Sequence, residues 1–528
     1  MAKYANLIAA IEAAIKTNGT QAITGQVLQN QLKNMISKLG SAYQFGGLVQ
    51  PTDAFSFDAD AKIAFLACTQ GRYPAFGNFS LRSGEVALFI YEGTWKKEII
   101  SYYANTQIYG IRHFFNNASP DLTRIGDADL HRDLPVQSLM RRCVVDDTGA
   151  VRYYLNADDS TKKEDGTAAN LTGADGQVMV EIPSHYRKAS LNTAGGYMDI
   201  EISLYPFEGA IRVPRYLVSA YEATLDREDN KLASVVNASA KYRGGNNNAD
   251  WDGTYRSLLG LPVTNISLTD FRTYGRNRGT GWGCYDYNAH LAIYWLFAIE
   301  YATLNSQKAF NPDLDSAGYH QGGLGPGVTN FSNWNNYNSN YPIIPCGYTN
   351  SLGNKTGVKT FTLTPEQAAA YGSEHSESVP SYRGIENPFG HIWKWTDGFL
   401  GVGTGEYQEI YVCRDASKYA SVVTSDYVHF SIHEATANGY CKAIVASDPN
   451  LQAEIRVFGD IFDRDDSGSD STYFCDYHFH VNTEGIVYGL LVGGAAGGGS
   501  DAGLACFFAT VGPAIAGADI GSRLTWSE

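Results

Sequence analysis

The sequence predicts an α+β protein in which short N-terminal helices and small β modules precede one large, loop-rich region. Three observations support this fold class. Helical spacing of apolar residues is concentrated in residues 3–39 and in one later segment, 288–307. Short alternating strands with Gly-containing turns fill residues 46–205. Loops rich in Gly, Asn and Tyr dominate the rest of the chain.

Composition and charge narrow the class of protein. The chain has 528 residues, of which 44% are hydrophobic and 13% aromatic, so it has enough apolar material for a core and enough length for several domains. Its net charge of −15 repels phosphate backbones and anionic lipid headgroups. We therefore expect neither a nucleic-acid partner nor insertion into a membrane.

The first segment, residues 1–45, is expected to hold two amphipathic helices that attach the protein or join its subunits. Apolar residues recur at helical spacing on each, and Gly40 follows the second as a stop signal. The two stripes consist of Leu7, Ile8, Ile11 and Ile15, and of Leu28, Leu32, Met35, Ile36 and Leu39. Because two such short helices bury little surface against each other, we expect a homo-oligomer, with a homotrimer favoured. Glu12 interrupts the first apolar run, which argues against a signal peptide.

Two β modules are expected next, at residues 46–105 and 106–205. The first contains a hairpin that turns at Glu92–Gly93–Thr94, and the second contains one that turns at Asp147–Thr148–Gly149. Residues 206–528 then form the largest domain, whose clearest helix covers 288–307. The eight cysteines have long, irregular gaps, which favours free buried thiols over a disulfide framework.

Two motifs in this last region resemble a known family. "NPFGHIWKWTDG" at residues 387–398 is similar to the N-x-x-G-N-V-W-E-W stretch of the formylglycine-generating-enzyme branch of the C-type-lectin fold. The closing "IGSRL" at 520–524 is similar to the terminal G-F-R-L strand of that branch. The resemblance implies a C-type-lectin-like domain, in which we expect Trp393 and Trp395 to be buried anchors and Gly390 to allow a tight turn.

Longer phrases resemble tail proteins of phages that infect gut bacteria, in which the lectin domain is diversified by a retroelement. They include "ITGQVLQNQLKNMISKLGSAYQFGG", "DSTKKEDGTAANLTGADGQVMVEIP" and "TYFCDYHFH". The resemblance implies a receptor-binding protein of the virion tail, made in the host cytoplasm. Its implied partners are a polysaccharide or protein of the bacterial surface and other tail proteins, and its implied variable region covers about 493–524.

Period-two spacing in that region predicts which positions vary. On an extended segment, Ala514, Ala516 and Ala518 would point inward, and the residues between them would point outward to the ligand. The expected variable, ligand-binding positions are Ala495, Gly497, Gly498, Asp501, Ala505, Cys506, Phe508, Thr510, Val511, Gly512, Ile515, Gly517 and Asp519. An ordinary strand without variation is the alternative.

Catalytic and metal sites have weaker signals, and we expect no enzyme and no cofactor. Lys394 replaces the Glu of the resembled motif, and Cys441, Cys475 and Cys506 lack the close pairing of that enzyme branch. His478 and His480 share a strand face but have no evident third ligand.

The acidic loop at Asp463, Asp465 and Gly468 has Phe474 where a calcium loop needs an acid, although a structural calcium ion elsewhere stays open. The Gly-rich stretch at 322–327 lacks the Lys-Ser/Thr of a phosphate loop. A depolymerase of surface polysaccharide and a purely structural tail or baseplate component are the alternative functions.

Overall fold

The structure is a computed structural model. It describes residues 44–54, 61–67, 71–81, 87–99, 107–192, 194–406, 408–433, 438–440 and 468–527. The chain divides into two compact units, Met1–Thr106 and Gln107–Glu528. The predicted helices of residues 3–39 lie outside the described residues.

The first unit contains a small four-stranded sheet. Its strands, in the order β1 (Gln44–Val49), β2 (Lys62–Ala67), β5 (Ala87–Glu92) and β6 (Trp95–Ile99), are joined by hydrogen bonds, and β3 (Gly71–Tyr73) pairs with β4 (Phe79–Leu81). The hairpin between β5 and β6 turns where the sequence predicts, with Gly93 at φ +83°. Its core includes the fully buried aromatic rings of Phe65, Tyr73 and Phe89.

The second unit is built mainly from three sheets with few helices. Its five-stranded sheet has the order β14 (Ile211–Val213), β12 (His185–Asn192), β13 (Tyr197–Ser203), β7 (Tyr109–Phe114) and β8 (Thr123–Gly126). Its six-stranded sheet has the order β10 (Val151–Tyr154), β9 (Arg141–Val145), β11 (Gln177–Ile182), β15 (Tyr216–Ser219), β30 (Leu524–Ser527) and β18 (Trp282–Cys284).

The third sheet carries the C-terminal region. Its order is β24 (Val428–His433), β23 (Gln408–Val412), β22 (Trp393–Gly403), β27 (Val487–Val492), β28 (Phe507–Ala509), β26 (Tyr477–His480) and β25 (Gly439–Tyr440), with β29 (Ile520–Gly521) beside β22. Two small sheets complete the unit. One pairs β16 (Thr224–Asp226) with β17 (Lys231–Ala233), and the other consists of β19 (Gly357–Thr362), β20 (Ser376–Tyr382) and β21 (Ile385–Glu386).

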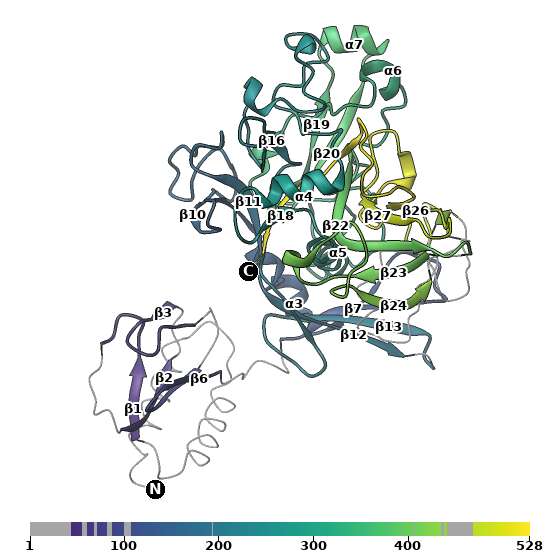
Figure 1. The fold of residues 1–528 in the computed structure, drawn as a ribbon. Coiled ribbons are helices and arrows are strands. Elements are labelled where there is room, and N and C mark those ends of the chain that lie inside the picture. Colours follow the sequence, from purple (N-terminus) through teal and green to yellow (C-terminus); the bar gives the residue numbers. More distant parts are fainter. Residues whose placement is uncertain are drawn as a thin grey trace. The chain divides into compact units, whose positions relative to one another are not determined.

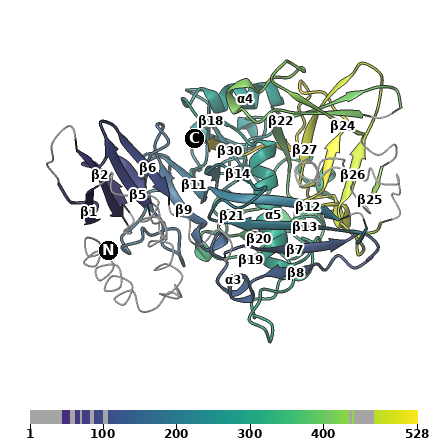
Figure 2. The same ribbon diagram turned by 90° about the horizontal axis from the view of Figure 1, so that it is seen from below.

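Helix α5 (Tyr287–Tyr301) is the centre of the second unit. Every residue of it except Asn288 is buried, since β7 of the five-stranded sheet and β22 of the third sheet both pack against it (Figures 1 and 2). It begins at Asp286, whose carboxylate accepts a hydrogen bond from Ala289 N at 2.9 Å, and ends at Ala302 in the left-handed conformation. The predicted helix is thus confirmed, although it ends at Tyr301, six residues before the predicted end at Gln307.

The other helices of the second unit are short (Figure 1). They are α3 (Ala128–Asp133), α4 (Leu268–Arg276), α6 (Trp334–Asn338) and α7 (Pro365–Tyr371), with 3-10 turns between them. Among the described residues, no helix is long and apolar enough to cross a membrane.

The boundary expected between residues 205 and 206 is wrong. Strands β9, β10 and β11, from the expected module at 106–205, share one sheet with β15, β30 and β18 from the expected lectin-type domain. Tyr216 is paired with Ile182 on one side and with Ser527 on the other. Strand β30 lies between β15 and the edge strand β18, a long-range pairing that local sequence patterns do not encode.

The "NPFGHIWKWTDG" segment lies beside the closing "IGSRL" segment in the structure. Gly390 has φ +71°, and a Cβ there would lie 2.9 Å from the carbonyl oxygen of Val328, so only glycine suits the turn. Trp393 pairs with Ile520 in parallel. Trp395 is fully buried, whereas Trp393 is only partly buried, so the prediction is confirmed for Trp395 and wrong for Trp393.

Candidate functional site

The third sheet carries aromatic side chains on one face because its register aligns them. Trp395, Leu491 and Phe508 lie opposite one another across β22, β27 and β28, and Phe479 of β26 lies beside Phe508. Opposed residues project to the same face of a sheet. The sequence neighbours of these residues point to the other face of the sheet and are aligned in the same way. All four are buried: Lys394, Val492, Phe507 and His478.

Five partly buried rings form a continuous row on the first face. From one end to the other they are Trp393, Phe508, Phe479, Tyr477 and Tyr440. Neighbouring ring centroids lie 5.5, 5.5, 4.6 and 5.0 Å apart in that order. These spacings are those of contacting aromatic pairs. We call these five residues the aromatic row.

Polar groups of Asp501 and Asp519 lie at the two ends of the aromatic row, a carboxylate at one end and a backbone carbonyl at the other. Tyr440 Oη donates a hydrogen bond to Asp501 Oδ1 at 2.6 Å and lies 3.2 Å from Ser500 Oγ. Burial, together with this carboxylate, raises the pKa of the Tyr440 hydroxyl, so it stays protonated at neutral pH. At the other end, Trp393 N donates to the carbonyl oxygen of Asp519 at 2.8 Å, and burial raises the pKa of the Asp519 carboxyl.

The Gly-rich stretch beside the row is held by hydrogen bonds from several elements. Gln307 Nε2 donates to the carbonyl oxygens of Gly499 and Ala502, at 3.0 and 2.6 Å. Asp476 accepts a hydrogen bond from Ala505 N at 2.7 Å. A Cβ at Gly503 would lie 1.9 Å from the Asp476 carboxylate, so this glycine lets the two segments approach. The small residues therefore form a packed frame for the row.

The structure separates the thirteen predicted positions into three groups. Ala495, Ala505 and Cys506 are buried, and Cys506 is completely so, which makes their assignment as ligand-facing positions wrong. Gly497 and Ile515 are exposed. The partly buried remainder consists of Gly498, Asp501, Phe508, Thr510, Val511, Gly512, Gly517 and Asp519. Two of the thirteen positions belong to or contact the aromatic row. Phe508 is a member of it, and Asp501 accepts a hydrogen bond from its Tyr440.

The predicted alternation at residues 514–520 is wrong. Strand β28 ends at Ala509, and residues 510–519 form turns. Pro513 has no backbone N–H to donate to a strand partner, and the carbonyl oxygens of Val511 and Gly517 instead accept from Gly489 N and Asn265 N, at 3.0 and 2.8 Å. Ala514 and Ala516 are consequently exposed, and Ala518 is partly buried, where an inward position was expected for each.

Sequence reasoning identified Phe508 but missed Tyr440, Tyr477 and Phe479 as members of the same surface. The alternation Tyr-His-Phe-His at 477–480 carried the signal, since period two places Tyr477 and Phe479 on one face. His478 is buried, with its ring stacked on Phe507 at a centroid distance of 5.5 Å, so it is a core residue.

The described residues contain no group of three or more His, Cys, Asp or Glu arranged to hold a metal ion. Asp463 and Asp465 of the acidic loop lie outside the described residues. Six of the cysteines are described, and all six are free and buried, as predicted: Cys143, Cys284, Cys346, Cys413, Cys475 and Cys506. Burial raises the pKa of the Cys475 and Cys506 thiols, which opposes formation of a reactive thiolate.

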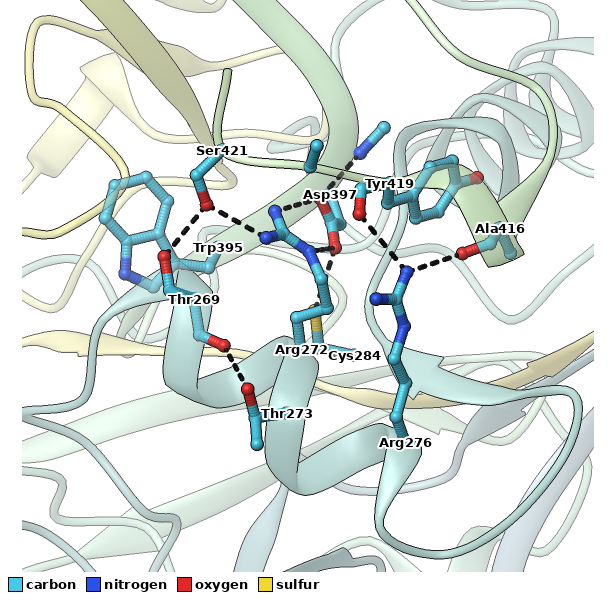
Figure 3. A network of polar contacts seen from close by, with 12 residues as sticks. Thr269, Arg272, Thr273, Arg276, Cys284, Trp395, Asp397, Ala416, Tyr419 and Ser421 are labelled. Carbon is cyan, nitrogen blue, oxygen red and sulfur yellow. Dashed lines mark hydrogen bonds and ion pairs between the residues drawn. The ribbon is translucent and has the colours of Figure 1, made fainter. Parts of the chain in front are cut away.

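A second cluster of titratable groups lies between α4 and β22 (Figure 3). Arg272 forms a bidentate pair with Asp397, at 2.7 and 2.8 Å, and donates to Ser421 Oγ at 2.9 Å. Asp286, whose backbone bridges to Asp397, is buried. Burial, with a contribution from Asp397, raises the pKa of Asp286 to about 7.

This acidic pair does not suit sugar hydrolysis. A pair of carboxylates with separated pKa values is what a glycosidase needs. Here, however, Asp286 caps α5, Asp397 neutralises Arg272, and the cavity beside them measures about 20 Å³, which is room for a single water molecule. The network in Figure 3 ties α4 and residues 416–421 to β22.

A third buried cluster explains Lys394, which occupies the Glu position of the resembled motif. Lys394 Nζ lies 2.9 Å from Glu222 Oε1 and donates to the carbonyl oxygens of Gly390 and Ile392. His391 Nε2 accepts from Ile343 N and Ile344 N, so its proton is on Nδ1, which contacts Glu222 Oε2 at 2.5 Å. Burial opposes ionisation of Glu222, but Lys394 and His391 together lower its pKa to about 2.

No protein-family model and no curated protein matches this sequence. Solved structures with some likeness include "Major Tropism Determinant U1 Variant", at 11% identity and a TM-score of 0.23, covering 90% of this chain and 86% of that chain. Another is "Major Tropism Determinant P3c Variant", at 12% identity and a TM-score of 0.20, covering 92% and 98%. TM-scores this low do not establish a shared fold, so function has to be argued from the chain's own residues.

Proposed function

We propose that the protein is a receptor-binding protein of a phage tail and that the aromatic row is its ligand-binding surface. The observation that carries the proposal is the row itself, five partly buried rings in contact across three strands and an edge strand of one sheet. Contiguous apolar surface that stays partly accessible to solvent on a folded domain is typical of binding sites, and Trp, Tyr and Arg are enriched among the residues that contribute most to binding.

The frame around the row supports recognition by variable side chains. The turns at 510–519 and the loop at 497–501 flank the row. The residues next to each segment are buried, and their backbone groups form hydrogen bonds. Side chains at exposed positions such as Gly497, Ala514, Ile515 and Ala516 can change without disturbing the core. The diversified positions are therefore proposed to be these exposed residues together with the row-forming Phe508.

The proposed ligand is a polysaccharide or protein of the bacterial surface. Rigid aromatic side chains contribute contact area at low entropic cost, and the hydroxyl of Tyr440 and the carboxylate of Asp501 add polar groups at one end. A single row has modest affinity, and copies in an oligomeric tail would strengthen attachment by avidity. The homotrimer, other tail proteins as partners and the absence of enzymatic activity belong to the same proposal.

Binding of the purified, fluorescently labelled full chain to a panel of gut-bacterial isolates tests the proposal. Saturable binding to some isolates is expected, and a Phe479→Ala/Phe508→Ala variant should lose it. Incubation with purified surface polysaccharide separates the main alternative, since release of new reducing ends would identify a depolymerase. Binding to no isolate, with normal incorporation into virions, would favour a structural tail component.

A further inference from the structure

A cavity of about 250 Å³ lies in the part of the second unit that carries α6, α7 and β19. Loops that the sequence marks only as rich in Asn, Gly and Tyr supply most of its wall. Its lining includes Tyr255, Arg256, Tyr337, Asn338, Phe361 and Gln367. The volume is smaller than that of a site for a drug-sized molecule, and it suits one sugar-sized ring.

Two buried polar atoms of the lining have no protein partner among the described residues. Tyr337 is 2% exposed and Asn338 is 4% exposed, yet Tyr337 Oη and Asn338 Oδ1 have no hydrogen bond from the protein. Asn338 Nδ2 donates to the carbonyl oxygen of Tyr341 at 2.6 Å, which fixes Oδ1 as the free end of the amide. Buried polar groups are nearly always paired, so these two atoms point to a ligand that supplies a donor and an acceptor.

The walls of the cavity are aromatic. The rings of Tyr255 and Tyr337 have centroids 5.6 Å apart and are tilted by 44°. Phe361 adds a third ring, and Pro342 and Pro345 add further apolar surface. A ligand that fills this space therefore needs apolar C–H surface as well as hydroxyl groups.

One charged side chain lies in the lining. Arg256 Nε donates to Tyr255 Oη at 2.8 Å, and its guanidinium carbon lies 5.5 Å from the ring centre of Trp251. These contacts hold the guanidinium at the cavity, and the described residues provide no acceptor for its terminal amino groups. No Asp or Glu lines the cavity, so it offers no partner to the ammonium group of an amino acid or amine.

We propose that this cavity binds a single pyranose residue that carries a carboxylate, as in a uronic acid. The apolar face of the sugar packs on Tyr255 and Tyr337, its hydroxyls hydrogen-bond with Tyr337 Oη and Asn338 Oδ1, and its carboxylate pairs with Arg256. The cavity is lined by none of the five residues of the aromatic row. The proposal therefore stands independently of the receptor-binding surface.

Isothermal titration calorimetry of the full chain with methyl glycosides of glucuronic, galacturonic and mannuronic acid tests this assignment. The neutral methyl glucoside, galactoside and mannoside are the comparison set. At least one acidic glycoside should bind about tenfold more tightly than its neutral counterpart, because a charge-assisted hydrogen bond is lost in the neutral sugar. Arg256→Gln should remove this preference.

Tyr337→Phe separates a binding role from a structural one. It should weaken sugar binding by roughly three- to tenfold, since one hydrogen bond is lost. It should not lower the Tm of the free protein, because Tyr337 Oη has no protein partner to lose. Tyr348→Phe is the matched control, since Tyr348 Oη donates to the carbonyl oxygen of Thr360 and Tyr348 does not line the cavity.

The control variant should keep wild-type sugar affinity. The assignment is overturned if no glycoside of either set binds at millimolar concentration, which would leave ordered water as the occupant. It is also overturned if Tyr337→Phe and Arg256→Gln bind the acidic glycosides as tightly as the wild type does.

Discussion

The ring of Phe508 lies 5.5 Å from the ring of Trp393, whose strand β22 runs parallel to β29 at this point. This contact joins one of the predicted variable positions to the most specific motif of the sequence. Variation at Phe508 would therefore change the surface beside a ring that the fold holds in place through the backbone hydrogen bond from Trp393 to Asp519.

Phe508→Ala should weaken attachment to a cell that the wild type binds by more than tenfold, since it removes the ring that joins Trp393 to Phe479. The loss of Tm should be modest, because the side chain is only partly buried. Cell-binding titration and thermal unfolding measure the two effects. Tyr411→Ala, which removes a partly buried ring stacked on His429 outside the row, is the matched control. Equal loss of attachment in both variants would indicate that the aromatic row is not the binding surface.

Enlarging Ala516 should leave stability unchanged, contrary to the expectation from period two, because Ala516 is exposed. Ala502→Leu should instead destabilise the protein by roughly 1–3 kcal/mol through overpacking, since Ala502 is completely buried and contacts the backbone near Gly494. Chemical denaturation of Ala516→Leu and Ala502→Leu compares the two sites. A large loss of stability in Ala516→Leu would mean that Ala516 is buried in the folded protein.

Glu222→Gln should destabilise the protein by about 3–5 kcal/mol at neutral pH, because it leaves the buried Lys394 without its counter-charge. The folded-state pKa of Glu222, about 2, lies below its ordinary value of 4.5. Its stabilising effect is therefore complete above pH 4.5 and is lost as the pH falls toward 2.

The free energy of unfolding, measured from pH 2 to 7 for wild type and Glu222→Gln, should converge at the acid end. Glu222→Gln/Lys394→Met, which removes both charges, should recover part of the loss. A constant difference across the pH range would show that Glu222 is not ionised in the folded protein.

The Asp286→Asn variant should gain stability relative to the wild type as the pH rises. Burial raises the folded-state pKa of Asp286 to about 7 from an ordinary 3.8, so the wild type loses stability as the pH rises between these values. Asn keeps the cap of α5 but carries no charge. Between pH 4 and 7, the free energy of unfolding measured in urea should rise for the variant relative to the wild type. A variant that loses stability equally at all pH values would indicate that only the cap matters.

Local patterns predicted the parts of the fold that depend on local physics. The helix of α5, the hairpin turns at Gly93 and Gly149, the tight turn at Gly390 and the burial of Trp395 all follow from spacing, turn chemistry or motif. These features need only near neighbours or one strong signature.

The aromatic row could not be predicted as a unit because its members meet through long-range register. Tyr440 reaches Tyr477 through an antiparallel bridge, and Phe479 reaches Phe508 through a parallel one. The alternation at 514–520 failed because small residues also suit turns, and Pro513 prevents a continuous strand. The cavity at Tyr337 was missed for a similar reason, since its wall combines residues from 255–261, 337–345 and 361–367, which are far apart in the sequence.

The aromatic row is proposed to be the surface that contacts the bacterial cell. Its most direct test is attachment of Phe479→Ala/Phe508→Ala to an isolate that the wild-type chain binds, with Tyr411→Ala as control and thermal unfolding as the check on folding. The account predicts that the double variant stays folded and loses saturable attachment, whereas the control attaches like the wild type. A folded double variant that attaches with wild-type affinity would contradict it.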